Sequence, residues 1–327
     1  MSASDDARWL AAAASLAARS RPLSRPNPAV GAIIVNGGKV VGCGWTQAGG
    51  RPHAEAMALE AAGNAVRGAT LYVTLEPCAH DSPRGPSCAG LVCASTLARV
   101  VVGCEDPDPR TGGLGVEAIR AAGIVVDLLP SAGADESLAG YMMLRRQGRP
   151  HVTLKLATSL DGCIALANGE SKWITGDAAR AHTHAMRARA DAILVGGGTL
   201  RADAPKLNVR LAGLEDRSPE RWVLTRGDAP DGWRALPSPE AVTALAHKQY
   251  LFVEGGAQTA AAFLAAGLVD RLLLYRAPIV IGGGRPAIGD IGLASLDDAH
   301  GRWRFVDRRQ LGSDMLDVYD AVPCSPA

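Results

Sequence analysis

Short apolar runs alternate with amphipathic stretches along the first part of the chain. The spacing of apolar residues predicts a helix over about residues 5–19, and the apolar runs on either side of Asn36-Gly37-Gly38 predict a β-hairpin, because Asn-Gly favours a tight turn. The elements predicted after the hairpin are a helix from near His53, a strand in 69–77, a helix in 88–97, a strand in 98–107, a helix in 114–122 and a strand in 123–130. This alternation predicts an α/β sandwich with helices on both faces of the sheet.

The pattern breaks at 141–150 (YMMLRRQGRP), where a basic stretch is followed by Gly-Arg-Pro. This break predicts a domain boundary, with one domain over 1–146 and a second over 147–327. The elements predicted in the second domain are a strand in 151–162, two strand–glycine–helix units in 191–200 and 249–270, a strand in 271–284 and two closing antiparallel strands around Gly312.

Composition narrows the functional classes. The chain has 327 residues, of which 47% are hydrophobic and 20% charged, so it can bury one large or two medium cores. The formal net charge of +1 gives no basic excess to hold a polyphosphate backbone, which argues against nucleic acid as the main partner. The seven cysteines are an odd number spread over a long chain, which is typical of a reducing cytosol rather than of a disulfide framework.

The beginning of the chain does not have the pattern of a secretory signal. Asp5 and Asp6 precede the apolar stretch Leu10–Ala18, where a signal would carry basic residues. No apolar run reaches the roughly 20 residues that span a bilayer. We therefore expect a cytoplasmic protein that has no membrane partner.

One group of residues has the composition of a catalytic zinc site. Such a site uses three protein ligands and leaves one position for water, and His53, Cys78 and Cys88 supply three. Glu55 is placed to exchange protons with the water, and Pro77 fixes the backbone before Cys78. Cys88 is expected near a helix N-terminus, where the dipole favours a thiolate.

Each of these residues has a plainer interpretation when taken singly. His53 is then an ordinary helix histidine, and both cysteines are small buried hydrophobes. The joint pattern favours the metal site, with His80 either as a fourth ligand or, because a catalytic zinc keeps an open position, as a residue that lines the pocket. For the other cysteines we expect buried thiols: Cys43, Cys93, Cys104, Cys163 and Cys324.

The spacing resembles that of the zinc deaminases that act on nucleobases, with one departure. Their pattern is H-x-E followed by P-C-x-x-C. Here nine residues separate the two cysteines instead of two. Asn-Pro-x-Val-Gly at 27–31, His-Ala-Glu at 53–55 and Leu-Glu-Pro-Cys-x-His at 75–80 together resemble the deaminase domain of the bifunctional riboflavin-biosynthesis deaminase–reductase family, which has a cytidine-deaminase-like fold and a long loop between the cysteines.

The resemblance assigns roles to residues of the first domain. It implies that His53, Cys78 and Cys88 bind Zn2+, that Glu55 is the catalytic proton shuttle and that Asn27 hydrogen-bonds the pyrimidine. The family loop is usually one residue shorter than here, and the sequence of segment 81–87 (DSPRGPS) departs from the one that is usual in the family. Arg84, or another residue of this loop, is the candidate contact for the substrate phosphate.

The second half contains glycine clusters at 196–198, 255–256 and 282–284. Two of them fall between a predicted strand and a predicted helix, where backbone N–H groups bind phosphate. None has the form G-x-G-x-x-G, because Arg201 occupies the sixth position counted from Gly196, and tight turns are the plainer interpretation. Arg187 and Arg210 are candidates to clamp a phosphate. For either arginine taken singly, a solvated surface charge is the plainer interpretation.

The second half contains the sequences KLATSLDG, GESKWIT, VGGGTLRADAPKLNVR and VEGG. They resemble the reductase domain of the same family, which has a dihydrofolate-reductase-like fold and uses NADPH. The resemblance implies cofactor contacts at Ala157, Trp173, Thr199, Asp203, Gly256, Ala257, Gln258 and Thr259, with Arg226 near the 2′-phosphate. It implies substrate contacts at Lys155, Ser171, Arg187, Leu207, Arg210 and Glu254. For Trp173, a position in the hydrophobic core is an equally good interpretation.

The resemblance covers nearly the whole chain and implies a two-step activity. The substrate that the resemblance implies is 2,5-diamino-6-ribosylamino-4(3H)-pyrimidinone 5′-phosphate, which would be deaminated and then reduced by NADPH at C1′ of the ribosyl group. The candidate proton sources for the reduction are Lys155, Asp203 and Glu254. A homo-oligomer, either a dimer or a tetramer, is expected.

Two other functional classes remain as alternatives. One is a tRNA adenosine deaminase with an accessory nucleotide-binding domain, and the other is a non-catalytic nucleotide-binding protein stabilised by zinc. The low net charge and the long loop between the cysteines argue against the first. The presence of Glu55 and of all three ligands argues against the second.

Overall fold

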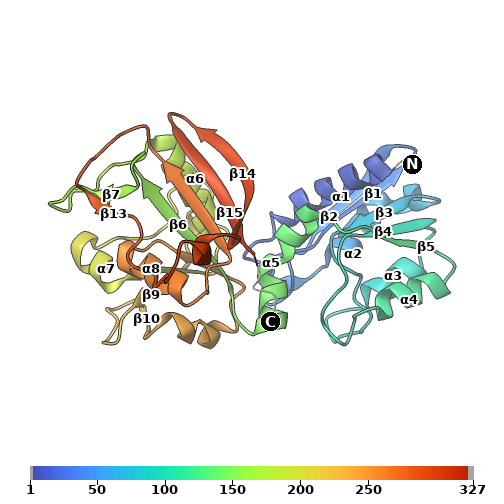
Figure 1. Cartoon of the computed structure of the whole chain (residues 1–327). Coiled ribbons are helices and arrows are strands. Elements are labelled where there is room, and N and C mark those ends of the chain that lie inside the picture. The colour runs from blue at the N-terminus through green and yellow to red at the C-terminus, as the bar shows by residue number, and fades with distance from the viewer. Residues whose placement is uncertain (1–2, 323–327) are drawn as a thin grey trace. The chain divides into compact units, whose positions relative to one another are not determined.

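The computed structural model describes residues 3–322 of the chain. The chain divides into two compact units, Met1–Gly148 and Arg149–Ala327 (Figure 1). Each unit has its own sheet and its own hydrophobic core, so each is described by itself.

The first unit is built on a five-stranded sheet with the order β2-β1-β3-β4-β5. β1 runs antiparallel to β2 and β3, whereas β3, β4 and β5 are parallel. The helices and strands are α1 (Ala3–Ala17), β1 (Gly31–Asn36), β2 (Lys39–Trp45), α2 (Ala54–Ala62), β3 (Thr70–Val73), α3 (Cys88–Cys93), β4 (Arg99–Val102), α4 (Leu114–Ala121), β5 (Val125–Leu128) and α5 (Ala132–Gln147), with 3₁₀ turns at Ala48–Gly50 and Gly63–Val66.

The predicted hairpin and helices of this unit are confirmed. Gly37 and Gly38 form the turn between β1 and β2 with φ angles of 55° and 75°, as a tight hairpin turn requires. α2 lies directly on β2, because a Cβ atom at Gly42 would come within 2.2 Å of the Ala58 carbonyl oxygen and one at Gly44 within 2.4 Å of that of Ala54. This close approach fixes the start of α2, where His53 and Glu55 lie.

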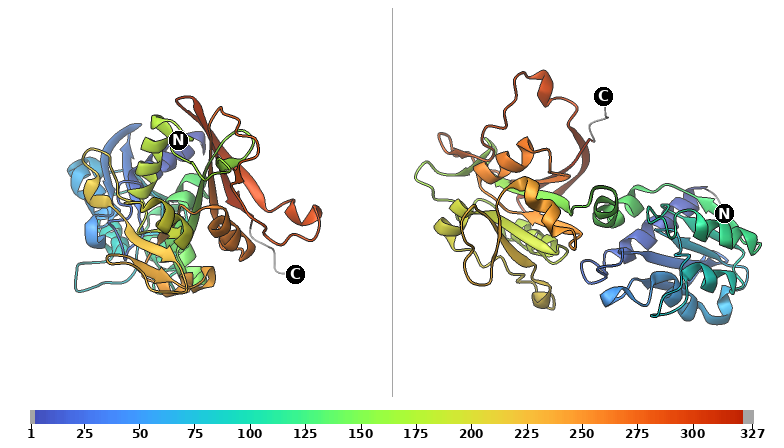
Figure 2. Two further views of the ribbon diagram at one scale, coloured as in Figure 1. Left: turned by 90° about the vertical axis from the view of Figure 1, so that its left-hand side faces the viewer. Right: turned by 90° about the horizontal axis from the view of Figure 1, so that it is seen from below.

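The two faces of the sheet are covered by different helices. Ile33, Val35 and Tyr72 pack against α1, whereas the alternate positions of the same strands pack against α2, α3 and α4. Helix α5, which lies beside α1 (Figure 2), was not predicted. The basic stretch of 141–150 therefore belongs to the end of α5 and the first residues after this helix, rather than to a linker that starts at Tyr141.

The second unit has an eight-stranded sheet with the order β10-β9-β8-β11-β6-β12-β15-β14. The strands from β10 to β12 are parallel, and β15 and β14 complete the sheet as an antiparallel pair. The helices and strands are β6 (His151–Thr158), β7 (Cys163–Ala165), α6 (Asp177–Arg187), β8 (Ala192–Gly196), α7 (Gly197–Asp203), β9 (Glu220–Leu224), β10 (Arg234–Leu236), β11 (Tyr250–Val253), α8 (Ala257–Ala265), β12 (Arg271–Arg276), β13 (Arg285–Pro286), β14 (Trp303–Leu311) and β15 (Asp314–Ala321), with 3₁₀ turns at Glu215–Arg217, Pro239–Leu245 and Asp297–Ala299.

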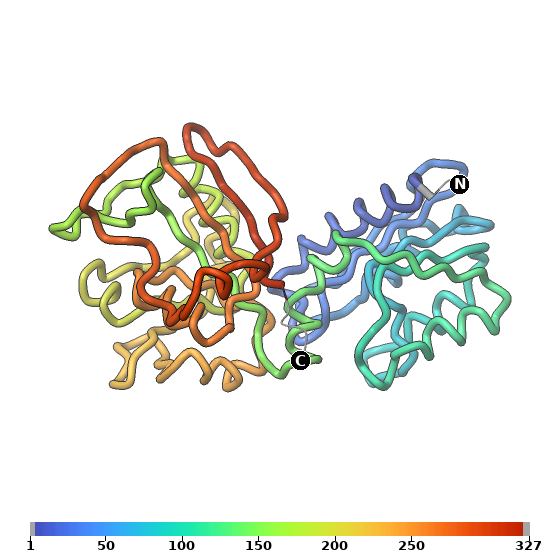
Figure 3. Tube along the Cα trace, in the orientation of Figure 1, coloured from blue at the N-terminus to red at the C-terminus, as the bar shows by residue number. Residues whose placement is uncertain are grey.

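Both strand–glycine–helix units and the closing antiparallel pair are confirmed in this unit. One face of the sheet packs against α8 through residues such as Leu154, Val253 and Phe263, and the other packs against α6 through Ile193 and Phe252. Figure 3 traces the connection 277–302 from β12 to β14, which contains β13; this short strand pairs with β7 to form a small separate sheet. The carboxyl ends of β6, β8 and β11 therefore lie together at one edge, where parallel α/β sheets bind ligands.

Candidate active sites

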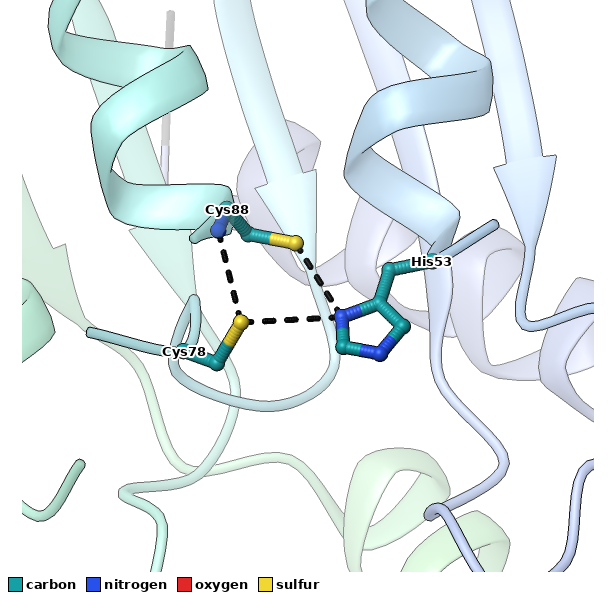
Figure 4. Close-up of side chains that lie close together, drawn as sticks. All are labelled: His53, Cys78 and Cys88. Carbon is teal, nitrogen blue, oxygen red and sulfur yellow. Dashed lines mark hydrogen bonds between the residues drawn. The ribbon is translucent and has the colours of Figure 1, made fainter. Parts of the chain in front are cut away.

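Three side chains in the first unit converge on one point (Figure 4). His53 is the residue before α2, Cys78 lies in the loop after β3, and Cys88 is the first residue of α3. The Nδ1 atom of His53 is 3.2 Å from Cys88 Sγ and 3.6 Å from Cys78 Sγ, and the backbone N–H of Cys88 donates to Cys78 Sγ at 3.3 Å. The three ligand atoms all lie within 4.8 Å of one another.

The donor set fits zinc. One imidazole nitrogen and two sulfur atoms are the ligands that a catalytic zinc prefers, with a fourth position left for water. A hydrogen bond from Cys88 is the main cause that lowers the pKa of the Cys78 thiol to about 4, so this sulfur is a thiolate at neutral pH. Cys88 begins a helix whose first turn is capped by the Ser87 hydroxyl, which accepts from the Gly90 N–H at 3.3 Å.

Glu55 lies beside this cluster in the first turn of α2 and is 3% exposed. The pKa of its carboxyl group is raised to about 7, mainly by burial; His53 opposes this shift and Cys78 adds to it. A carboxyl group with a pKa near neutrality can both accept and return a proton, which is what a general acid–base catalyst needs.

Asn27 contacts the cluster in a way that the sequence did not indicate. Its side-chain amide nitrogen lies 2.9 Å from Nε2 of His53 and donates to the Gly50 carbonyl oxygen at 3.0 Å. Nε2 is the ring nitrogen that points away from the two sulfur atoms, so Asn27 orients the imidazole from the side opposite the cysteines. The predicted contact between Asn27 and the pyrimidine stays a prediction.

The loop 81–87 is tied to the segment 49–51. Asp81 closes the loop by accepting from the Ser87 N–H at 2.7 Å. Arg84 donates to the Gly49 carbonyl oxygen at 3.0 Å, and Arg51 donates to that of Pro86 at 3.2 Å. These contacts hold two arginines close to the residues that precede His53.

Among residues 3–322, His80 and the cysteines other than Cys78 and Cys88 lie outside the metal cluster. His80 has its Nδ1 atom 3.5 Å from the hydroxyl oxygen of Thr111. The expectation of a buried thiol holds for Cys163, but Cys43 is exposed because it faces outward on the edge strand β2, and Cys93 and Cys104 are half-buried. Cys324 lies outside the described residues.

Glu76 is a structural residue that the sequence analysis missed. It is 2% exposed, and its carboxylate accepts from the backbone N–H groups of Gly113 and Val116, both at 3.0 Å, and of Asp106 at 3.3 Å. Gly113 and Val116 belong to the start of α4, which has no cap of its own. One side chain two positions before Cys78 therefore caps a helix and anchors the metal-binding loop.

The second unit contains a cavity of about 1350 Å³ at the carboxyl ends of its parallel strands. All the residues that the sequence analysis assigned to the reductase half line it: Lys155, Ala157, Ser171, Trp173, Arg187, Thr199, Asp203, Leu207, Arg210, Arg226, Glu254, Gly256, Ala257, Gln258 and Thr259. Several other residues of the lining were not expected from the sequence, among them His184, Arg201, Lys206 and Arg285. This volume is larger than the usual range for one small ligand.

The two arginines of the expected phosphate clamp have different environments. Arg187 donates from Nε and Nη2 to the two carboxylate oxygens of Glu254, at 2.6 and 3.0 Å, and from Nη1 to the Asn208 carbonyl oxygen at 3.0 Å. Burial alone would raise the pKa of Glu254, but Arg187 outweighs burial and holds it below its usual value. Arg187 and Glu254 therefore form a buried ion pair, whereas Arg210 contacts His184 through Nε at 3.2 Å.

Trp173 and the glycine turns complete the cavity. Trp173 is 64% exposed and lies 4.8 Å from the Arg180 guanidinium, so its alternative interpretation as a core residue is wrong. Thr259 of α8 leaves no room for a side chain at the strand ends: a Cβ atom at Gly196 would lie 2.2 Å from its hydroxyl oxygen, and one at Gly255 would lie 2.4 Å from its Cβ atom. The glycines thus allow the helix to reach the cavity.

Comparisons with known proteins identify both halves. Residues 3–104 match the family described as the cytidine and deoxycytidylate deaminase zinc-binding region, and residues 150–316 match the RibD C-terminal domain. The riboflavin biosynthesis protein RibD of Aquifex aeolicus is 37% identical over 90% of this chain and 92% of its own length. RibD of Mycobacterium tuberculosis is 40% identical over 89% of this chain and 90% of its own length.

Solved structures give the same result. The structure of Acinetobacter baumannii RibD has a TM-score of 0.83 and 33% sequence identity and covers 98% of this chain and 99% of its own. A Thermotoga maritima protein described as a diaminohydroxyphosphoribosylaminopyrimidine deaminase/5-amino-6-(5-phosphoribosylamino)uracil reductase has a TM-score of 0.85 and 29% identity, with the same coverage. The cytidine-deaminase-like fold of the first unit and the reductase fold of the second are thereby confirmed, and the tRNA deaminase alternative is not supported.

No helix among the described residues is both long and apolar enough to cross a membrane.

The cluster of His53, Cys78 and Cys88 lies within the region that matches the zinc-binding deaminases, and the large cavity lies within the region that matches the reductase domain. The chain therefore belongs to the RibD family and is a bifunctional enzyme of riboflavin biosynthesis, with a zinc-dependent deaminase in its first unit and an NADPH-dependent reductase in its second.

Proposed function

We propose that the chain deaminates 2,5-diamino-6-ribosylamino-4(3H)-pyrimidinone 5′-phosphate and then reduces the product to 5-amino-6-ribitylaminouracil 5′-phosphate. One observation carries the proposal: a single chain holds both a three-ligand zinc cluster beside a buried carboxyl group and a separate cavity lined by all the residues expected of the reductase. We further propose that the catalytic units coincide with the predicted domains, 1–146 and 147–327.

When bound, a zinc ion would supply an acidified water molecule as the nucleophile of the deamination. His53, Cys78 and Cys88 would hold the ion, and Asn27 lies against the ring of His53. Glu55 would take one proton from the attacking water and give it to the ring nitrogen of the pyrimidine. It would then take the second proton from the hydroxyl group that has added to the ring and give it to the amino group, which leaves as ammonia. Burial suits Glu55 to both directions of transfer, because it places the pKa of the carboxyl group at about 7.

In the reduction, Lys155 is the proton source that the geometry supports best. When bound, NADPH would supply the hydride for C1′ of the ring-opened ribosyl imine, and a proton would have to reach the adjacent nitrogen. Glu254 is held as a carboxylate by Arg187, and Asp203 lies 3.6 Å from the ammonium group of Lys172 at the rim. Lys155 lines the cavity without a hydrogen-bond partner among the described residues, and burial lowers its pKa, which makes it a better acid.

An assay of NADPH absorbance tests the whole proposal. Wild type should oxidise NADPH when it receives the undeaminated diaminopyrimidine, with one ammonia released for each NADPH. The Glu55→Gln variant should do so only with the deaminated compound, whereas Glu60→Gln, an exposed control on the same helix, should act as wild type does. If wild type leaves NADPH unchanged even with the deaminated compound, the assignment of the reductase substrate is wrong.

We also propose a homo-oligomer, a dimer or a tetramer, in the cytoplasm, with no nucleic-acid or membrane partner. β14 is an outer strand of the eight-stranded sheet, and two of its apolar side chains, Phe305 and Val306, are 54% and 39% exposed. A long edge strand with exposed apolar residues supports pairing between copies. Light scattering on the eluting protein should give a mass of at least twice the 33.8 kDa chain, and Phe305→Lys should reduce it. A monomeric wild type would contradict the proposal.

A further inference from the structure

We propose that His184 positions Arg210 so that its guanidinium group recognises the phosphate of the reductase substrate. The inference rests on the proposed function, because it takes the substrate to be a ribosyl phosphate. It concerns a residue that acts through another, so His184 is a positioning residue rather than a catalytic one.

The first observation is that only one of the two arginines in the expected clamp is free to bind a dianion. Arg187 uses Nε, Nη1 and Nη2 within the protein, and the carboxylate of Glu254 balances its charge. Arg210 is exposed and lines the cavity, and no carboxylate lies within ion-pair distance of it among the residues that the structure describes. The two terminal nitrogens of Arg210 make no hydrogen bond within that part of the chain, so its planar fork is available to phosphate oxygens.

The second observation is that both nitrogens of the His184 ring face the same residue. Nε2 lies 3.2 Å from the Nε atom of Arg210, and Nδ1 lies 3.3 Å from its backbone nitrogen. His184 is 8% exposed on α6, so the packing of the helix fixes the ring before any ligand binds. An arginine side chain has many rotamers, and a contact at Nε restricts them while leaving both terminal nitrogens free.

The protonation state of His184 suits this contact. Burial is the main cause that lowers its pKa, and the charges of Arg187 and Arg210 lower it further. The ring is therefore neutral at physiological pH and has a single lone pair. In the tautomer that carries the proton on Nδ1, this lone pair is on Nε2 and accepts the Nε–H of Arg210, and the approach of Nδ1 to the backbone nitrogen of Arg210 is a contact without a hydrogen bond. A charged ring would instead repel the arginine.

The backbone that carries Arg210 is held independently. Leu207 and Val209 are 4% and 1% exposed and anchor the segment in the core, and Leu207 has a φ of 53°, which a leucine adopts only when packing imposes it. The segment thus brings Arg210 to the cavity, and His184 determines where its side chain points. Helix α6 helps to place both arginines, because it carries His184, which contacts Arg210, and one turn later Arg187 itself.

The test compares reduction kinetics of the full chain on two compounds: the deaminated ribosylamine 5′-phosphate and the same molecule without its phosphate. His184→Leu removes the acceptor at similar size, and His184→Gln keeps an acceptor oxygen. Arg210→Met removes the fork. The matched control is His182→Leu, because His182 lies on the same helix but contacts Tyr275 at 2.8 Å and does not line the cavity.

We expect His184→Leu to raise the KM for the phosphorylated compound about tenfold, as the loss of one hydrogen bond to a charged group predicts. Its kcat, its KM for NADPH and its KM for the compound without phosphate should stay within about twofold of wild type. His184→Gln should restore most of the affinity, and Arg210→Met should remove the preference for phosphate altogether. His182→Leu should keep the preference of wild type.

Three results would overturn the inference, and they are distinguishable. If Arg210→Met keeps the preference for phosphate, the phosphate binds elsewhere, and the role proposed for Arg210 fails as well. If Arg210→Met loses it but His184→Leu keeps it, only the role of His184 fails. If His184→Leu raises both KM values equally or lowers kcat alone, His184 is merely structural. Should the leucine variant not fold, His184→Asn, which is polar but too short to reach Arg210, gives the same three outcomes.

Discussion

The two active sites of this chain are built in opposite ways. The three residues proposed to bind zinc lie between positions 53 and 88 on neighbouring elements, and each belongs to a short recognisable sequence motif. The reductase cavity draws on residues from 155 to 286 that come from many strands, helices and loops, and it contains a buried ion pair. The first site should therefore fail completely when one ligand is lost, whereas the second should lose its functions one at a time.

The strongest test of this contrast removes a zinc ligand. Cys88→Ser should lower deaminase activity by more than about a hundredfold and leave the chain without its stoichiometric zinc, because each ligand supplies a third of the protein's coordination. Reduction of the deaminated compound should stay near the wild-type rate. Metal analysis, ammonia release and NADPH oxidation measure the three quantities.

A cysteine outside the cluster provides the control for that experiment. Cys43 is exposed and has no place in the metal site, so Cys43→Ser should keep both the zinc and the deaminase activity. If Cys88→Ser bound a full equivalent of zinc, the set of three ligands would be wrong.

The next largest effect is expected at Lys155. Lys155→Met should lower kcat of the reduction about a hundredfold, the lower end of the usual contribution of a general acid, with little change in the KM for NADPH. Because the pKa of Lys155 is lowered from 10.5, wild-type kcat should fall as the pH rises through a value below 10.5, and the variant should lack that step. Deaminase activity of the same sample is the internal control. An unchanged kcat would mean that the proton comes from another group.

The contrast between the sites also explains what the sequence could predict. The convergence of His53, Cys78 and Cys88 was predictable because each residue lies in a short contiguous motif, and a metal accepts few kinds of donor. The second site was predictable in outline, since strand–glycine–helix units place loops at one edge of a parallel sheet. The pairing of Arg187 with Glu254 was not, because the two residues are far apart in the sequence and meet only in the folded unit.

Two helices were missed for a physical reason. The positions that α6 buries are Ala179, Thr183 and His184, which are small or polar and give no apolar period. α5 carries Gly133 and Gly140 within its length, and glycine weakens a helical pattern. The contact of His184 with the cavity would have been predictable only if the helix that carries Arg187 had been predicted, because a helix places His184 one turn before Arg187.

A third test breaks the buried ion pair of the second unit. Glu254→Gln should lower the free energy of unfolding by about 3 kcal/mol, because it leaves the Arg187 guanidinium buried without a counter-charge. Calorimetry should show a lower melting temperature, whereas Glu170→Gln, at an exposed position of the same unit, should leave it unchanged. A melting temperature equal to that of wild type would show that the pair contributes no net stability.

The same pair gives a prediction for acid conditions. The folded state holds the pKa of Glu254 below its ordinary value of 4.5, so the stabilisation is present above pH 4.5 and is lost as the pH falls through the lowered value. Wild type should therefore lose more of its free energy of unfolding than Glu254→Gln does when the pH is lowered from 7 to below 4.5. Parallel losses in the two proteins would argue against the pair.

The smallest effect concerns Glu76, where the carboxylate meets backbone N–H groups instead of a charged side chain. A glutamine at this position keeps one acceptor oxygen but turns an NH2 group toward donors, so Glu76→Gln should cost about 1 to 2 kcal/mol of unfolding free energy. Because Glu76 anchors the loop that carries Cys78, the variant should also bind zinc more weakly in competition with a chelator, by about tenfold. Glu117→Gln, at an exposed position of α4, controls for the loss of charge near the start of that helix. If Glu76→Gln loses stability but keeps the zinc affinity of wild type, the capping of α4 and the placement of Cys78 are separate, and the first site depends on its three ligands more than on their support.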